Sequence, residues 1–159
     1  MTTPRYRNKS AKPSEKFVNK YELTDHEYFM GELVYRIRAL KDFGCIKAGD
    51  LGGWVSGEHN LSQYGTCWIG LAARAYQQAQ VRVDAQICGY AVLSENAITA
   101  GDCEIFGSVE LRGHADIADE IKIGGYTIVG GKIKLRGNRK ITSQYELMAY
   151  IDERRAVRA

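Results

Sequence analysis

The stretch GDCEIFGSVELRGHADIADE, residues 101–120, holds a small or aliphatic residue at every sixth position, beginning at Cys103. A second aliphatic residue follows two positions after each of these, as Ile105 does, and glycine follows two positions later at 107 and 113. Alternating apolar residues are typical of a short strand with one buried face, and glycine allows a bend where a side chain would obstruct it. The stretch therefore predicts strands of a few residues, separated by bends at a period of six.

The same period continues over most of the chain. The first position is small or aliphatic in all thirteen units that start between Leu61 and Ile133, and the fifth position is glycine in eight of them. Neither the alternation nor the glycine spacing fits the 3.6-residue period of a helix. Strands this short cannot bury a core alone, so the units must stack on one another. The pattern predicts a β-solenoid.

The unit small-x-aliphatic-x-Gly-x, as in Ala85-Gln-Ile-Cys-Gly-Tyr, resembles the hexapeptide repeat of left-handed parallel β-helices over residues 61–138. That resemblance implies that three units form one triangular coil of about 18 residues. The expected fold class is an all-β solenoid, a left-handed parallel β-helix of about four coils with an N-terminal β cap and a C-terminal α-helix. The segment from KYELT to GTCWI also resembles the N-terminal part of poorly characterised bacterial and phage or prophage β-helix proteins, often labelled hexapeptide transferases from fold alone.

Both ends of such a rod would expose unpaired strand edges, so the flanking sequence is expected to cover them. Four segments follow: a flexible basic N-terminal tail over 1–18, an N-terminal β cap and lead-in turn over 19–60, the hexapeptide-repeat β-helix over 61–140, and a C-terminal cap helix over 141–159.

Local patterns support both caps. Residues 33–40, LVYRIRAL, alternate as a strand does, KYEL is placed to pair beside them, and GDLGGWV is expected to turn the chain into the first coil,. At the other end, Ser143 and Glu146 have the spacing of a capping box,. Leu147, Met148 and Ile151 follow at helical spacing and predict the apolar side of a helix,.

Composition limits the cellular setting. No apolar run is long enough to span a bilayer or to serve as a signal-peptide core, so a cytoplasmic protein is expected, in the host cytoplasm if it is phage-encoded,. The four cysteines form no CxxC pair and no zinc spacing, which favours reduced structural thiols and no metal site,.

Residues 21–131 hold eight basic and fifteen acidic side chains, whereas residues 1–20 and 132–159 each carry a net charge of +5. Basic ends suit direct contact with nucleic acid, although solubility explains them equally well.

Residues 18 apart share a corner of the predicted coil. One such corner column collects short polar side chains: Thr66, Asp84, Asp102, Glu120 and Asn138. Asp116 lies close by in sequence. Two interpretations stand: an acidic strip that binds a cationic partner, or Asx-type residues that hydrogen-bond the turn backbone.

A second surface is predicted to be apolar where it faces solvent. Trp68 and Phe106 belong to outward positions of one face, and Tyr90 and Tyr126 share the adjoining corner. Exposed aromatic groups mark protein interfaces, and a homo-oligomer, dimer or trimer, through one flat face fits them. Trp68 has an alternative place beneath the N-terminal segment.

Three functions follow from these features. The first is a non-enzymatic binding protein without a cofactor that recognises a protein or nucleoprotein partner through Asp84, Asp102, Asp116, Glu120 and the aromatic surface. Phage resemblance suggests an inhibitor of host defence there, such as an anti-CRISPR or anti-restriction factor.

The second function is an acyltransferase of the hexapeptide class that uses acetyl-CoA, with His114 as the base that the resemblance implies. No carboxylate is placed by the period to orient that imidazole, and no loop interrupts the thirteen units. The third is a structural module that only oligomerises. A three-histidine zinc site is rejected, because the coil register cannot bring His26, His59 and His114 together,.

Overall fold

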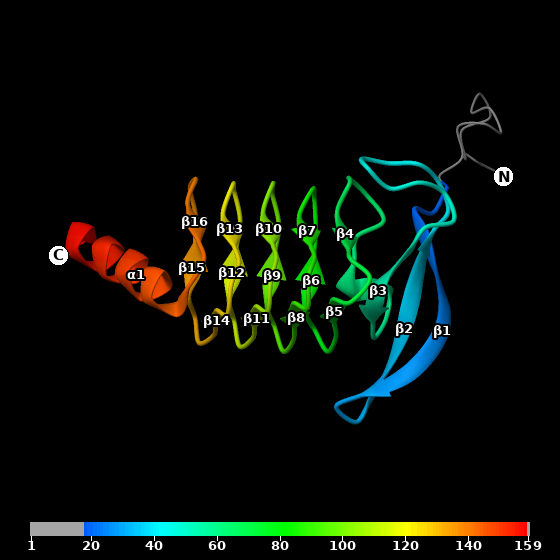
Figure 1. Cartoon of the computed structure of the whole chain (residues 1–159), viewed down its shortest axis with the longest axis horizontal. Coiled ribbons are helices and arrows are strands. Elements are labelled where there is room, and N and C mark those ends of the chain that lie inside the picture. Colours follow the sequence, from blue (N-terminus) through cyan, green and yellow to red (C-terminus); the bar gives the residue numbers. More distant parts are fainter. Residues whose placement is uncertain (1–17, 159) are drawn as a thin grey trace, which may run out of the picture.

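The computed structural model describes residues 18–158, with side chains described as far as 155. It is a straight rod of stacked coils, with a long β-hairpin at one end and a helix at the other (Figure 1). The fold prediction is confirmed, because the chain forms a parallel β-solenoid with one C-terminal helix. The predicted flexible tail lies outside the described residues except for Val18.

Each coil contributes one short strand to each of three sheets. The first sheet contains β3 (Leu51–Val55), β5 (Arg74–Ala75), β8 (Val92–Leu93), β11 (Glu110–Leu111) and β14 (Ile128–Val129). The second contains β6 (Gln80–Val81), β9 (Ile98–Thr99), β12 (Asp116–Ile117) and β15 (Lys134–Leu135). The third contains β4 (Trp68–Ile69), β7 (Gln86–Ile87), β10 (Glu104–Ile105), β13 (Lys122–Ile123) and β16 (Lys140–Ile141). Within each sheet, neighbouring strands of the coils pair in parallel, and paired residues are 18 positions apart in the sequence. Three hexapeptide units therefore complete one coil.

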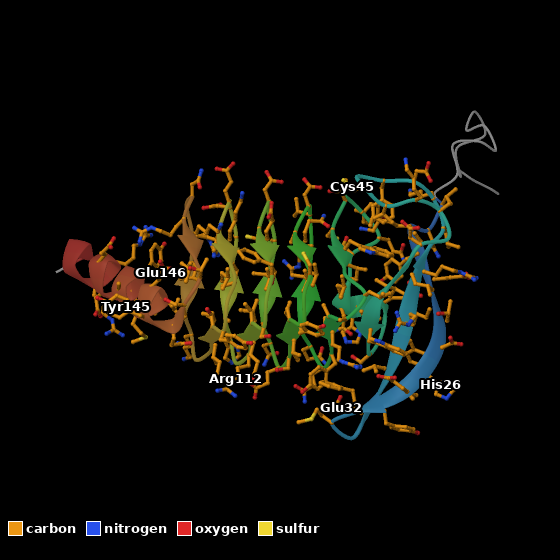
Figure 2. All side chains as sticks on the ribbon, in the orientation of Figure 1. His26, Glu32, Cys45, Arg112, Tyr145 and Glu146 are labelled. Carbon is orange, nitrogen blue, oxygen red and sulfur yellow. The ribbon has the colours of Figure 1, made fainter. Side chains whose placement is uncertain are left out.

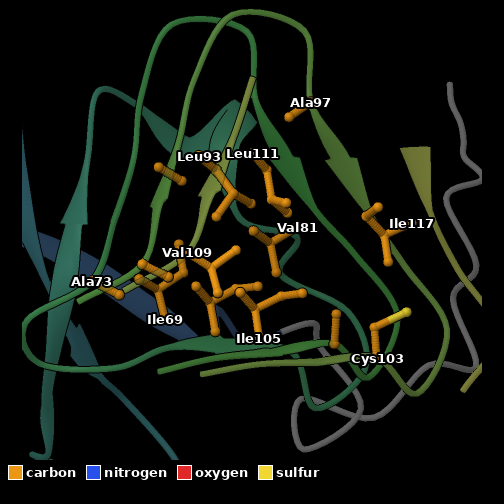
Figure 3. Close-up of a cluster of buried hydrophobic side chains, with 14 of the residues drawn as sticks. Ile69, Ala73, Val81, Leu93, Ala97, Cys103, Ile105, Val109, Leu111 and Ile117 are labelled. Atoms are coloured by element: carbon orange, nitrogen blue, oxygen red, sulfur yellow. The ribbon is translucent and has the colours of Figure 1, made fainter. Parts of the chain in front are cut away.

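The interior of the rod is filled by the two apolar columns of the repeat. Leu93 and Leu111 from the first sheet, Val81 from the second and Ile105 from the third point into the same space (Figure 3). All four side chains are at most 1 % exposed. Burial of the small first position lets each corner close tightly, while the branched third position fills the centre, which is why the two columns differ in size.

The rod has about five coils, where the repeat count predicts about four. The difference arises at both ends, where strands lie outside the thirteen units. Trp54 and Val55 of β3 already pair in parallel with Arg74 and Ala75, and β16 adds a side after the last unit. Residues 51–55 of the expected GDLGGWV turn are therefore a strand.

Most bends of the coils have a left-handed backbone, including several without glycine, although Leu71 at the same place in its unit does not. Gly101 and Gly113 have φ values of 68° and 64°, and Val83 and Asp119 take φ values of 62° and 64° at equivalent positions. Positive φ is unusual for a β-branched residue such as valine. Stacking of neighbouring coils, rather than the local residue, thus sets the bend.

Side chains of the N-terminal cap replace the missing neighbour of the first coil. The hairpin of β1 (Tyr21–Phe29) and β2 (Glu32–Ala39) continues the first sheet antiparallel to β3, which confirms the predicted pairing. Lys20 is fully buried, and its ammonium donates to the carbonyl oxygen of Cys67 at 2.8 Å. Asn60 donates to the carbonyl oxygen of Ala79 at 2.7 Å. Both side chains satisfy carbonyl groups that a preceding coil would otherwise bind.

The C-terminal helix α1 (Gln144–Arg158) covers part of the opposite end and then points away from the rod (Figure 1). Gln144 accepts from the N–H of Ile128 and donates to its carbonyl oxygen, at 2.8 and 3.1 Å, and so imitates a further strand on β14. The Tyr150 hydroxyl donates to the carbonyl oxygen of Arg136 at 2.7 Å. Within the described residues no helix is long and apolar enough to cross a membrane.

Two details of the predicted helix need correction. The hydroxyl of Ser143 accepts from the N–H of Glu146 as expected, but the Glu146 carboxylate accepts from the N–H and hydroxyl of Thr142, one residue before the expected donor. Met148 is 47 % exposed, and Tyr150 is buried in its place. Helical spacing does not predict the burial of Tyr150, because its hydroxyl bonds the backbone of Arg136, the residue after β15.

The cysteines at 45, 67, 88 and 103 are free thiols. Burial raises the pKa of Cys103 from 9.0 to about 11. Between pH 9 and pH 11 the Cys103 thiol loses its proton in the unfolded chain but keeps it in the folded protein. The free energy of unfolding therefore falls as the pH rises through this interval. We expect Cys103 to account for a loss of about 2 to 3 kcal/mol of unfolding free energy over that interval. Urea unfolding of the wild type and Cys103→Ala at pH 8 and pH 11 measures it. A variant that loses as much stability as the wild type would contradict the assignment.

Candidate functional site

A groove runs along the corner where the acidic column is predicted. It has a volume of about 550 Å³ and is lined by Gly44, Cys45, Ile46, Thr66, Asp84, Gln86, Asp102 and Glu104. Loop 44–46 leaves the N-terminal cap and forms one side, where Cys45 lies (Figure 2). The period misses this loop, as well as Glu104, which points outward from β10. The groove therefore presents three carboxylates and no cationic side chain.

Asp84 has a structural role in the turn. Its carboxylate accepts from the N–H of Thr66 at 3.0 Å and from the Thr66 hydroxyl at 2.8 Å, and these bonds lower its pKa. The carboxylate of Asp119 accepts in the same way from the N–H of Gly137 at 2.9 Å. The turn-stabilising interpretation of the acidic corner thus holds at Asp84. Whether the corner also binds a partner stays a prediction.

The remaining predicted acids lie in two different places. Asp102 and Glu120 continue the corner column beyond Asp84, because the N–H of each binds the carbonyl oxygen of the next coil. Asp116 instead lies on β12, on the adjoining face, and pairs with Arg136 at 3.1 Å. The structure brings three of the four acids together and leaves Asp116 paired elsewhere.

Trp68 is not part of an exposed aromatic surface, which corrects one interpretation of the outward column. Its side chain is only 4 % exposed. The rings of Phe43 and Tyr21 pack against it edge-on, with centroids 5.3 and 6.5 Å away. The N-terminal segment therefore covers Trp68, which is the alternative place given by the sequence.

The other predicted aromatic residues remain at the surface to different degrees. Tyr90 is 72 % exposed and Tyr126 is 84 % exposed, two coils apart along one corner. Phe106 is half-buried, because its ring lies against the backbone of Gly124. The Lys140 ammonium lies 5.7 Å from the centroid of the Phe106 ring. A partner for these residues stays a prediction.

His114 is exposed at the corner between β11 and β12. Its backbone N–H donates to the carbonyl oxygen of Gly131 at 2.7 Å, so Lys132 lies one coil beyond it in the same column. Among residues 18–155, no side chain forms a hydrogen bond or ion pair with the imidazole. The ring is free of polar contacts within the described part of the chain, and no group there fixes its orientation.

Sequence periodicity misses a basic pocket at the C-terminal end. It lies between β15 and α1, has a volume of about 390 Å³, and is lined by Lys132, Ile133, Lys134, Tyr150, Ile151, Arg154 and Arg155. Four of these seven residues are cationic and none is acidic. The sequence shows that basic residues cluster after residue 131. It does not show that the helix packs beside the strand and brings these residues together.

No protein-family model matches the chain. A stretch of 77 residues, 48 % of this chain, is 35 % identical to a protein of Escherichia coli (strain K12) described as the uncharacterized acetyltransferase YdcK. That stretch covers only 20 % of the length of the relative. The comparisons give no support to a phage origin or to inhibition of host defence. The chain is a hexapeptide-type parallel β-helix that is similar, over about half its length, to a protein named as an acetyltransferase.

Proposed function

We propose that this chain transfers an acetyl group from acetyl-CoA to an acceptor hydroxyl or amine, with His114 as the general base. The observation that carries the proposal is the similarity to a protein named as an acetyltransferase. The coil architecture supports it, because resemblance to the hexapeptide class already implies an acyltransferase as one function of this repeat.

His114 is the best placed of the three histidines for this role. The Nε2 atom of His59 is 2.6 Å from the carbonyl oxygen of Gln77, so that ring is engaged with the first coil. His26 lies on β1 and packs against the ring of Tyr35, with centroids 6.3 Å apart. Among the described histidines, only His114 combines a position on the coils with an imidazole that neither a side chain nor a backbone group of the described residues engages.

A neutral imidazole at this place would accept the proton of the acceptor as the acceptor attacks the thioester carbonyl. The carbon–sulfur bond then breaks, and coenzyme A leaves as its thiol after taking up a proton. His114 lacks a carboxylate to orient it in the described chain, so orientation has to come from the bound substrates or from a second copy of the chain.

Thiol release tests the proposal directly. The full chain is incubated with acetyl-CoA and, separately, with panels of small amines and sugar alcohols, and free thiol is measured with a chromogenic disulfide. We expect release that depends on both enzyme and acceptor, together with saturable acetyl-CoA binding by calorimetry. Absence of acetyl-CoA binding at millimolar concentration would reject acyl transfer for this chain.

A further inference from the structure

We propose that the basic pocket between β15 and α1 binds a small ligand that carries two or more adjacent phosphate groups. The inference goes beyond acyl transfer, because it is argued from the pocket alone. Lys134 begins β15, the last strand of the second sheet, and Lys132 lies two residues before it. Arg154 and Arg155 come from the last turns of the helix.

Two of the acids near the pocket are already paired with arginines that do not line it. Asp116 pairs with Arg136 at 3.1 Å, and Glu153 pairs with Arg139 at 2.9 Å. Asp152 lies 4.0 Å from Arg155 in an exposed pair, which contributes little,. Lys132, Lys134 and Arg154 have no ion-pair partner among residues 18–155. The pocket thus holds three cations without a counter-ion, which repel one another until an anion binds.

The guanidinium of Arg154 is held by the pocket itself. Its central carbon lies 5.6 Å from the centroid of the Tyr150 ring, and Tyr150 is 4 % exposed with its hydroxyl bonded to the backbone of Arg136. An arginine held over a fixed aromatic ring loses less side-chain freedom on binding, and its planar donors match phosphate oxygens. Tyr150 therefore forms a rigid floor on which Arg154 is pre-positioned.

The strand edge adds a backbone donor on the same side. Asp116 is the register partner of Lys134, and the N–H of Asp116 donates to the carbonyl oxygen of Ile133. In a parallel ladder the N–H of Lys134 then points away from β12, toward α1. A backbone N–H beside lysines and an arginine is the donor set that phosphate oxygens accept best.

The size of the pocket selects the ligand class. A volume of about 390 Å³ lies at the lower end of the range for small-molecule sites and is larger than one phosphate group requires,. Four cations also exceed the charge of a single phosphate. A pyrophosphate or triphosphate group matches both the space and the charge, whether it belongs to coenzyme A or to a free nucleotide.

Calorimetric titration with inorganic tripolyphosphate at low salt tests the pocket. We expect the wild type to bind it, and we expect the double variant Lys134→Glu/Arg154→Glu to bind at least tenfold more weakly. The matched control is Lys47→Glu/Arg82→Glu, which changes the net charge equally on exposed residues far from α1. Far-ultraviolet circular dichroism verifies that each variant is folded. Equal weakening in both double variants, or no binding by the wild type, would overturn the inference.

Two further arms identify the source of the phosphates. Loss of coenzyme A binding in the pocket variant, with the control variant unaffected, would assign the pocket to the acyl donor. Binding of ATP but not coenzyme A would assign it to a free nucleotide and leave the phosphate site standing while acyl transfer fails. Binding of single-stranded RNA without tripolyphosphate would overturn a small-ligand pocket in favour of a nucleic-acid surface.

Discussion

Gly53→Ala is expected to lower the free energy of unfolding by about 3 kcal/mol or more, at the upper limit of what overpacking of one methyl group costs. A Cβ at this position would lie 2.2 Å from the carbonyl oxygen of Ala73 and 2.3 Å from that of Gly70. Neither oxygen is free to move, because the Trp54 N–H binds the first and the Ala73 N–H binds the second. The clash therefore has to separate β3 from the first coil.

Fluorescence-detected urea unfolding measures this loss well, because Trp54 and Trp68 both lie in the affected region. Gly130→Ala is the matched control. Its Cβ would meet only Arg112, at 3.5 Å, and its backbone is not left-handed, so we expect stability within about 1 kcal/mol of the wild type,. If Gly53→Ala were as stable as this control, the close approach of cap and coil would not be needed for folding.

The double glycine of residues 52–53 shows what a local pattern leaves undetermined. Two adjacent glycines indicate a turn, whereas here they let β3 cross close to the first coil. The hexapeptide period, by contrast, predicts the coils correctly, because each unit contacts chiefly its neighbours 18 residues away. Architecture that depends on nearest neighbours can be predicted from a repeat, but contacts made by the caps cannot.

Trp68 and the two pockets illustrate the same limit. The outward position of Trp68 follows from the repeat, but Phe43 covers it from a loop outside the repeat. Glu104 joins the acidic groove because loop 44–46 closes one side. Lys134 and Arg154, 20 residues apart, line one pocket because Tyr150 and Gln144 anchor α1 to the backbone of the coils. Each feature that the repeat does not predict depends on a long-range contact made by a residue of one of the two caps.

His114→Ala is expected to slow acetyl transfer by about 10²- to 10⁴-fold, the range that a general base contributes. Binding of acetyl-CoA should change little, because the imidazole would act on the proton of the acceptor rather than hold the donor. The rate constant for thiol release therefore falls, while the dissociation constant from calorimetry stays within about threefold of the wild type.

Two comparisons separate a catalytic role of His114 from a structural one. Added imidazole should restore part of the rate of His114→Ala, since the substitution removes an exposed ring whose space a small base can enter. His26→Ala removes another exposed histidine, on β1, and is expected to retain the wild-type rate within twofold. Equal rates for His114→Ala and the wild type would exclude His114 as the base. A loss that imidazole cannot rescue, together with altered unfolding, would assign His114 to the turn between β11 and β12.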